Sequence, residues 1–175
     1  VDIKDISQGM GSDLRIGERF LRAGPAYGGS CFPKDTRALI DIGNHFKTDL
    51  SIIKTVIASN DKRKFLFIKK MEEILHGKLK NKTITFLGVT FKPNTDDMRE
   101  ASSIPMIKYL NKKNSNIRYY DPSGEKHEFK KLKNVEYYND IKSACFNSDL
   151  IVLHTEWNDF KLLNFKKIVK KNKFK

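Results

Sequence analysis

The chain has 175 residues, which is long enough to bury a hydrophobic core and to hold one domain, or one domain and part of another. Lysine and arginine total 34 against 21 aspartates and glutamates, so the formal net charge is +13. Such a charge is typical of a protein with an acidic partner, or simply of a solvated lysine-rich surface. The lysines are spread along the chain without a basic stripe interleaved with aromatic residues, which argues against a nucleic-acid binder.

The two cysteines and four histidines show no metal-ligand spacing, so we predict no metal site. Cys145 lies far from Cys31 in the sequence and is predicted to be a structural residue. A secreted chain of this size would more often carry a framework of paired cysteines, and no apolar run is as long as a membrane span. The first residues also lack a signal-peptide pattern. We therefore expect a soluble, cytoplasmic protein that does not enter a membrane.

Helices are predicted throughout the first part of the chain. Residues 1–23 are typical of the end of one helix and a short second helix, for which Ser12 and Asp13 offer N-caps. Residues 36–46 predict another helix, which ends near residues 43–45.

One long helix is predicted over residues 49–76, where apolar residues recur at three-and-four spacing and Gly77 offers a C-cap. A helix of this length between a helical region and a different pattern indicates a domain boundary. We therefore predict a helical region over residues 1–78 and an α/β domain over residues 79–175.

The second part of the chain alternates between strands and helices. Its first apolar run, TITFLGVTF from Thr83, is typical of a buried parallel strand. The predicted elements that follow are a helix at 102–110, strands at 116–121 and 135–138, a helix at 140–147, a strand at 149–155 and a last helix at about 160–169. This alternation predicts an α/β fold with a Rossmann-like, doubly wound parallel sheet. His154 is unusual in a buried strand, and we interpret it as a tolerated substitution.

A single cysteine stands between a glycine turn and a helix start in GPAYGGSCFPKD, residues 24–35. Pro33 fits the first turn of a helix, which would place Cys31 at a helix N-terminus. There the helix dipole and Lys34 both favour the reactive thiolate form. A lone cysteine is more often a small buried apolar residue, but Gly28 and Gly29 and the nearby lysine fit an accessible nucleophile better.

Two long motifs resemble a known enzyme family. GPAYGGSCFPKDTRAL, from Gly24, resembles the active-site segment of the nucleotide-sugar dehydrogenases of the UDP-glucose/GDP-mannose dehydrogenase family. GVTFKPNTDDMREASS, from Gly88, resembles the start of that family's C-terminal domain. The motifs occur in the family's order, and the resemblance runs from SDLRIGERFL at Ser12 to TEWNDF at Thr155.

The resemblance also indicates which parts of the enzyme this sequence does not contain. The family's NAD-binding domain usually begins with a strand and G-x-G-x-x-G, and this sequence has no such motif. The family's central helix with a catalytic lysine and asparagine is also missing, as is a final strand with a further arginine. The resemblance therefore implies a C-terminal portion, with a sheet incomplete at its C-terminal end, that needs an N-terminal NAD-binding half.

The resemblance implies that the enzyme oxidises the primary alcohol of a nucleotide sugar twice, to the acid, with two NAD⁺ as cofactors. Cys31 corresponds to the nucleophile that forms a thiohemiacetal and then a thioester. Lys34 matches a lysine that contacts the cofactor and adds positive charge beside the thiolate. Asp35 matches an aspartate that positions or activates water, although it could equally be a first-turn partner of the helix dipole.

Further residues are implied to bind substrate or cofactor. Arg15 matches an arginine that reaches the neighbouring subunit's substrate site, which implies a homodimer. Lys92 matches a substrate-binding lysine beside Phe91, and Arg99 matches an arginine that contacts NAD. The loop implied to hold the sugar nucleotide, largely through backbone groups, comprises Phe20, Leu21, Arg22, Ala23 and Gly24, together with Gly28.

Three alternatives remain open from the sequence. Lys92 and Arg99 could belong to a salt-bridged loop with Asp96, Asp97 or Glu100. The resemblance implies UDP-glucose as substrate and UDP-glucuronate as product, and CFPKD favours this branch over relatives that oxidise N-acetylated sugars, but GDP-mannose is the closest alternative. Without a cofactor domain the chain could also be a non-catalytic nucleotide-sugar-binding module. Finally, Ala26 stands where the family pattern leads us to expect glycine, which would strain the loop if that position requires a positive φ.

Overall fold

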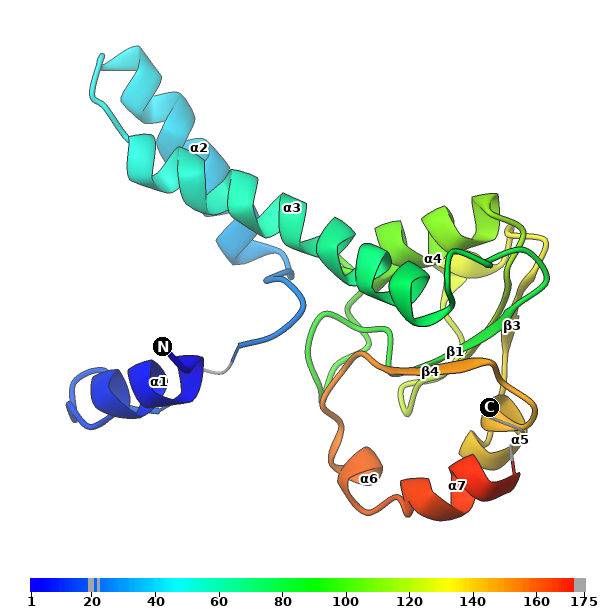
Figure 1. The fold of residues 1–175 in the computed structure, drawn as a ribbon. Helices are drawn as coiled ribbons and strands as arrows, with labels where there is room; N and C mark the ends of the chain where they lie inside the picture. The colour runs from blue at the N-terminus through cyan, green and yellow to red at the C-terminus, as the bar shows by residue number, and fades with distance from the viewer. Residues whose placement is uncertain (19–20, 22, 172–175) are drawn as a thin grey trace.

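A computed structural model describes residues 1–18, 21 and 23–171, with the backbone alone for 169–171. The chain begins with helix α1 (Ile3–Gly11), continues in two antiparallel helices and ends in an α/β domain (Figure 1). The helix predicted after Ser12 is not formed over the described residues 12–18. Instead the Asp13 carboxylate accepts a hydrogen bond from the Arg15 backbone N–H, and Gly17 has a φ of 68°. Both features favour turns over a helix.

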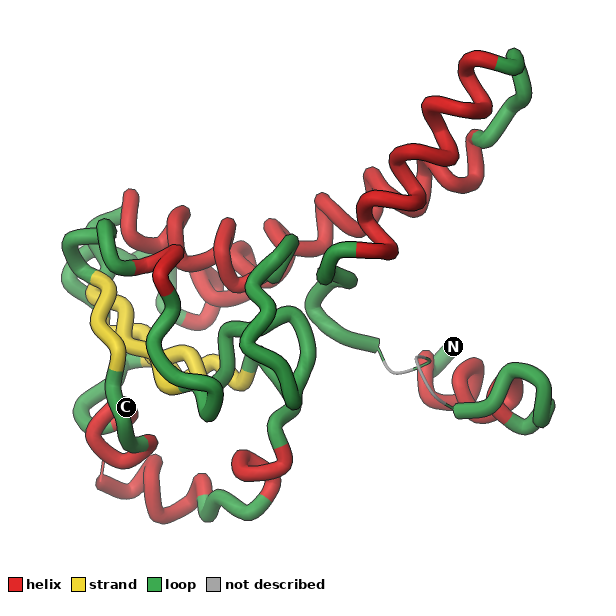
Figure 2. The backbone as a smooth tube through the Cα atoms, turned by 180° about the vertical axis from the view of Figure 1, so that it is seen from behind, coloured by secondary structure: helices red, strands yellow, loops and turns green. Residues whose placement is uncertain are grey.

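Helices α2 (Cys31–His45) and α3 (Ser51–Ile74) confirm the other helices predicted for the first part. They pack against each other as a hairpin that projects away from the sheet (Figure 2). A Cβ atom on Gly43 would lie 2.5 Å from Leu50 Cδ1, so glycine at this position allows the two helices to approach. Helix α3 ends at Ile74 with Leu75 as its C-cap, two residues before the predicted C-cap Gly77, whose N–H donates to the Glu72 carbonyl at a φ of 72°.

Four parallel strands form the sheet in the order β3-β2-β1-β4. Their bounds are Thr83–Leu87 for β1, Asn116–Tyr120 for β2, Val135–Tyr137 for β3 and Leu150–Leu153 for β4. The register pairs Ile84 of β1 with Ile117 of β2 and with Leu150 of β4. All four predicted strands are confirmed. Because β1 lies between β2 and β4, the sheet changes winding direction between β1 and β4, where such folds bind ligands.

Helices cover both faces of the sheet, as the doubly wound fold class predicts. Helix α4 (Ser103–Lys112) and the last turns of α3 cover one face, and the other carries α5 (Ile141–Cys145), α6 (Asn158–Lys161) and α7 (Phe165–Lys171) (Figure 1). The single helix predicted at about 160–169 is therefore wrong. Asn164 interrupts it, because its side chain accepts a hydrogen bond from the Lys167 N–H and begins α7. A short 3₁₀ helix, His127–Phe129, follows β2.

The larger core lies between α3, α4 and the sheet, where Phe86, Met106, Ile107 and Leu110 are almost fully buried. Cys145 lies in the smaller core with Leu87 and Phe160, which confirms its structural role. Burial raises the pKa of the Cys145 thiol to about 11, so it stays protonated and unreactive near neutral pH. In the part of the chain that the structure describes, no helix combines the length and apolarity needed to cross a bilayer.

Candidate active site

Cys31 is the first residue of α2, so its predicted place at a helix N-terminus is confirmed. Its side chain is exposed, and the Ser30 hydroxyl lies 3.6 Å from Sγ. Lys34 and Asp35 follow at helical spacings of three and four residues, so all three side chains share one face of α2. This arrangement leaves the thiol open to a ligand and places a cation and a carboxylate beside it.

Lys34 and Asp35 form an ion pair with Nζ and Oδ1 2.9 Å apart. The pKa of Lys34 is raised, first by this hydrogen bond and last by the charge of Cys31. Helix α2 has no acidic residue in its first turn, so the interpretation of Asp35 as a first-turn partner of the dipole is wrong. Both side chains are mostly exposed and remain available to a ligand or to water.

The glycine pair before Cys31 packs directly against Phe91. A Cβ atom on Gly28 would lie 2.5 Å from the Glu100 carbonyl oxygen, and one on Gly29 would lie 2.9 Å from the Phe91 ring. Gly29 also has a φ of 85°, and its N–H donates to the Arg99 carbonyl over 2.8 Å. Only glycine fits this approach, and it brings the cysteine to the loop that follows β1.

Phe91, Lys92 and Arg99 come from that loop, and the Phe91 side chain and the Arg99 carbonyl contact the glycine pair. The Lys92 ammonium is 5.3 Å from the centre of the Phe91 ring. The Arg99 guanidinium binds both carboxylate oxygens of Asp97, which confirms the salt-bridged alternative for Arg99. This hydrogen bonding is the first cause of a lowered pKa of Asp97 and a raised pKa of Arg99, and the charge of Cys31 raises the latter further. Arg99 therefore lies within electrostatic reach of the thiol.

An open hollow of about 530 Å³ lies beside the start of α2. Its lining includes three cationic side chains and two carboxylates, namely Lys34, Arg37, Arg99, Asp41 and Glu100, with Gly29, Ser30, Pro33 and Ala38 completing it. The two residues expected to contact the cofactor, Lys34 and Arg99, thus face the same space. Among the described residues, no three His, Cys, Asp or Glu side chains are grouped as metal ligands would be.

The remaining expected substrate residues are more dispersed. Leu21, Ala23 and Gly24 precede the glycine pair in a loop without regular structure, and Phe20 and Arg22 lie outside the described residues. Arg15 is not part of the cluster around Cys31. Its side chain is 89% exposed and pairs with Asp13 over 2.6 Å, on the segment after α1 that stands apart from the α/β domain (Figure 1).

Comparison with known proteins accounts for this combination of a cysteine loop and a parallel sheet. Residues 1–62 match the central domain of the UDP-glucose/GDP-mannose dehydrogenase family, and residues 85–175 match its UDP binding domain. The chain belongs to the UDP-glucose/GDP-mannose dehydrogenase family. This confirms the resemblance seen in the two sequence motifs.

Relatives in the UDP-glucose/GDP-mannose dehydrogenase family include the UDP-glucose 6-dehydrogenase of Rickettsia typhi, which is 44% identical over 169 residues, 95% of this chain and 39% of the relative. The enzyme of the same name from Rhizobium meliloti is 38% identical over 95% of this chain and 38% of its own length. A solved UDP-glucose dehydrogenase from Pyrobaculum islandicum superposes with a TM-score of 0.84 at 29% identity, covering 99% of this chain and 43% of that structure. The chain thus spans about two fifths of the relatives' length.

One departure from the motif of the UDP-glucose/GDP-mannose dehydrogenase family proves harmless. Ala26 is not among the described residues with a positive φ, so alanine fits there without backbone strain. The concern that this residue strains the loop is therefore wrong.

His154, the residue after β4, belongs to a buried hydrogen-bond network, so the interpretation as a merely tolerated residue is wrong. Thr155 donates its hydroxyl proton to the Thr90 carbonyl, so its oxygen is free to accept from His154 Nδ1 over 3.0 Å. His154 Nε2 then accepts from the Ser102 hydroxyl over 2.8 Å. Desolvation lowers the pKa of His154 to about 4, which keeps the ring neutral. The network ties the segments that follow β1 and β4 to the start of α4.

A second buried network uses Asp121, the acidic residue after β2. In dinucleotide-binding folds an acidic residue near this place often binds a ribose hydroxyl. Here the Asp121 carboxylate instead accepts hydrogen bonds from the Val89 N–H over 2.8 Å and from Ser123, and it lies 3.7 Å from the Lys126 ammonium. Its oxygens are occupied within the protein, so it fixes the loop after β1.

Polar residues of α3 that the sequence analysis did not select also contact the site. Asn60 bonds the backbone of Tyr27, Arg63 bonds the Gly24 carbonyl, and Lys64 pairs with Glu100. A signal for Asn60 and Lys64 exists, because these two polar residues interrupt the apolar stripe of this helix. The face runs through Ile53, Ile57, Asn60, Lys64, Ile68, Met71 and Leu75.

Proposed function

We propose that this chain supplies the reactive cysteine and the nucleotide-sugar site of an enzyme that oxidises UDP-glucose to UDP-glucuronate with NAD⁺. The observation that carries the proposal is the packing of Gly28 and Gly29 on Phe91, which brings Cys31 to the loop of Lys92 and Arg99. A thiol with cations around it and a loop open to a ligand is the arrangement that nucleophilic catalysis by cysteine requires. The 44% identity to a UDP-glucose 6-dehydrogenase supports the choice of substrate.

Cys31 would act after the alcohol has been oxidised to the aldehyde. Its thiolate adds to the aldehyde carbon, and the carbonyl oxygen takes up a proton to give a thiohemiacetal. Loss of a hydride and a proton from this adduct leaves a thioester. Water then attacks the thioester carbon, the C–S bond breaks, and the acid and the thiol are released. Asp35, on the same helix face as Cys31, would position the water and accept its proton.

The residues that would hold NAD are Lys34 and Arg99, as expected from the resemblance. The hollow they line also contains Arg37, and three cations suit the negatively charged diphosphate of a dinucleotide. Bound NAD⁺ supplies the acceptor for the hydrides of both oxidation steps. Lys34 and Arg99 would also hold positive charge beside the cysteine, which stabilises the thiolate and the oxyanion that forms when it adds to a carbonyl.

The nucleotide sugar would bind through Lys92, beside Phe91, and through the backbone of the loop that includes Leu21, Ala23, Gly24 and Gly28, with Phe20 and Arg22. Lys92 is exposed and lies over the Phe91 ring, so its ammonium group is accessible to an anionic ligand. Backbone N–H groups of a glycine-rich loop suit a diphosphate.

The active enzyme would be a homodimer in which Arg15 reaches the partner's substrate site, and it would need an N-terminal NAD-binding half. Exposed apolar side chains on the α2–α3 hairpin support such contacts, among them Leu39, Ile42, Phe46, Ile52 and Val56. We also propose a division into a helical region over 1–78 and a UDP-binding domain over 79–175. The separate matches to 1–62 and 85–175 support this division.

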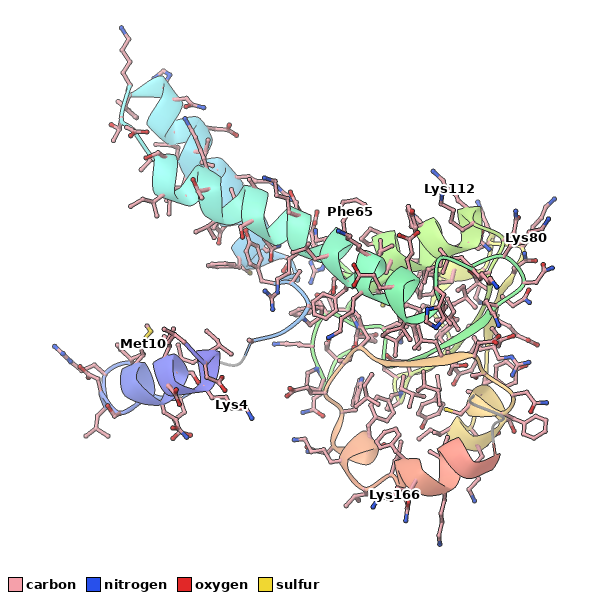
Figure 3. All side chains as sticks on the ribbon, in the orientation of Figure 1. Lys4, Met10, Phe65, Lys80, Lys112 and Lys166 are labelled. Carbon is pink, nitrogen blue, oxygen red and sulfur yellow. The ribbon has the colours of Figure 1, made fainter. Side chains whose placement is uncertain are left out.

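Calorimetric titration of the 175-residue chain with UDP-glucose tests the proposal, with GDP-mannose as competitor. We expect UDP-glucose to bind and Lys92→Ala to weaken it at least tenfold, as for a lost charge-assisted hydrogen bond of about 1.5–3 kcal/mol. Lys112→Ala is the matched control, because it removes the same charge at the far end of α4 (Figure 3). A folded sample that binds neither nucleotide sugar would refute the proposed site, and tighter binding of GDP-mannose would refute the substrate.

A further inference from the structure

We propose that Asn60 is a positioning residue that preorganises the cysteine loop, defined here as residues 24–30. Asn60 lies in the middle of α3, 33 residues from the loop residue that it contacts. The proposal deepens the proposed function, because it rests on the cysteine loop as a nucleotide-sugar site.

The Asn60 side chain makes two complementary hydrogen bonds with the main chain of Tyr27. The Tyr27 N–H donates to Asn60 Oδ1 over 2.9 Å, and Asn60 Nδ2 donates to the Tyr27 carbonyl over 3.2 Å. A primary amide offers one acceptor and two donors, so it can pair with a peptide unit as a neighbouring strand would. One turn further along α3, Arg63 Nε donates to the Gly24 carbonyl over 2.8 Å. Helix α3 therefore holds the loop at two points through its backbone.

The position of Asn60 in the helix supports a specific role. It is half-buried on a face of α3 where apolar side chains both precede it, at Ile53 and Ile57, and follow it, at Ile68 and Met71. Asparagine has poor helix propensity, and a half-buried amide there must recover its lost contacts with water. The pair of bonds to Tyr27 does so.

The opposite side of the cysteine loop is fixed by the loop after β1. The Gly29 N–H donates to the Arg99 carbonyl, and Gly28 lies against the Glu100 carbonyl. Arg37 of α2 and Lys64 of α3 both pair with the Glu100 carboxylate. The loop is thus held between α3 and residues 99–100 before any ligand binds. A loop already ordered in its binding conformation loses less conformational entropy on binding.

Amide hydrogen exchange in Asn60→Ala, measured residue by residue by NMR in the 175-residue chain, tests this inference. The reporter is the Gly29 amide, which bonds Arg99 and does not contact Asn60. We expect it to exchange about tenfold faster in the variant, as for a lost restraint of about 1.4 kcal/mol. We also expect the dissociation constant for UDP-glucose to rise about tenfold. The control is Ser59→Ala, at an exposed neighbour on the same helix, which should change neither.

The outcomes separate this inference from the proposed function. Faster exchange at Tyr27 alone, with Gly29 unchanged, would overturn the positioning role, as would an equal effect of Ser59→Ala. If Gly29 exchanges faster but the affinity for UDP-glucose is unchanged, ordering of the loop by Asn60 does not matter for ligand binding, and that part of the inference is overturned. Failure of the unaltered chain to bind UDP-glucose would refute the proposed function, whereas the exchange result would still decide whether Asn60 orders the loop. If the exchange of the β1 amides shows that Asn60→Ala is unfolded, Asn60→Asp replaces it, because aspartate keeps the acceptor for the Tyr27 N–H. The Gly29 amide should then exchange faster than in the unaltered chain, but by less than tenfold. An unchanged Gly29 exchange rate would contradict the positioning role.

Discussion

The helical hairpin and the α/β domain differ sharply in how they bury their apolar residues. Before Lys64, only Gly29, Pro33 and Gly43 are buried among the described residues. Beyond it, a continuous core fills the space between α3, α4 and the sheet. The α/β domain therefore carries its own source of stability, whereas the hairpin leaves many of its apolar side chains exposed. The cysteine loop lies where these two regions meet.

The largest expected effect is on the core of the α/β domain. Ile107 of α4 is fully buried, and Ile52 of α3 is 76% exposed. Because truncation leaves a cavity only at the first site, we expect Ile107→Ala to lower the free energy of unfolding by about 3 to 4 kcal/mol. Ile52→Ala should change it by less than about 0.5 kcal/mol. Urea denaturation of both variants measures the difference, and equal losses would mean that the hairpin is packed in solution as tightly as the core.

The next prediction concerns the buried imidazole of His154. The unfolded chain protonates this group below about pH 6.5, but the folded chain does so only near pH 4, so unfolding takes up a proton between these values. The free energy of unfolding should therefore fall as the pH is lowered from 6.5 to 4, by about 3 kcal/mol for this pKa difference.

Urea denaturation at pH 7 and pH 4.5 measures this change, and His154→Leu should flatten it. His127→Gln is the control, since His127 is exposed. Carboxylates whose pKa is lowered in the fold, such as Asp97 and Asp140, change the free energy of unfolding mainly below pH 4. An equal pH dependence in His154→Leu and the unaltered chain would contradict the prediction.

A smaller effect is expected where the two regions touch. Gly29 and Gly77 both have positive φ, but only a Cβ at Gly29 meets another group, the Phe91 ring. We expect Gly77→Ala to lower the free energy of unfolding by about 1 kcal/mol from backbone strain. Gly29→Ala should lower it by about 2 to 3 kcal/mol, because the clash adds to the strain. Thermal or urea denaturation distinguishes them, and equal costs would show that Phe91 moves aside without penalty.

The smallest effect belongs to the ion pair between Arg37 and Glu100, whose charged groups are 3.3 Å apart and nearly half exposed. A double-mutant cycle with Arg37→Met and Glu100→Gln should give a coupling energy of about 0.2 to 1 kcal/mol. The coupling should weaken at high salt because solvent ions screen it. A larger coupling energy that does not change with salt would contradict the prediction, because it would mean that the ion pair is shielded from solvent.

Much of the fold follows from local sequence patterns. Short apolar runs predict the four strands, and the three-and-four spacing predicts α3. Both patterns are local, because the buried residues of one strand or one helix lie close together in the sequence. The expectation for Cys31 rested on Pro33 and the glycines, which are local signals as well. The break between α6 and α7 was missed, since a single asparagine cap at Asn164 outweighed the apolar spacing around it.

The contacts that organise the candidate site were less accessible to sequence reasoning. Asn60 meets Tyr27 across 33 residues, and Ser102 meets His154 across 52. Neither pair has a short-range signature, so only the folded chain shows them. The sequence nevertheless shows one member of each pair as an unusual residue. Asn60 lies on an otherwise apolar helix face, and His154 lies in a run predicted to be a buried strand.

Side chains of α3 form hydrogen bonds with the backbone of the cysteine loop at Gly24 and Tyr27. Pro25 and Ala26 lie between these two residues and take part in neither hydrogen bond. Substitutions at these two positions leave the anchoring bonds available. The side chains of the loop can thus vary while its path is retained, so under the proposed function positions 25 and 26 are the sites to vary in a selection library aimed at altered nucleotide-sugar choice.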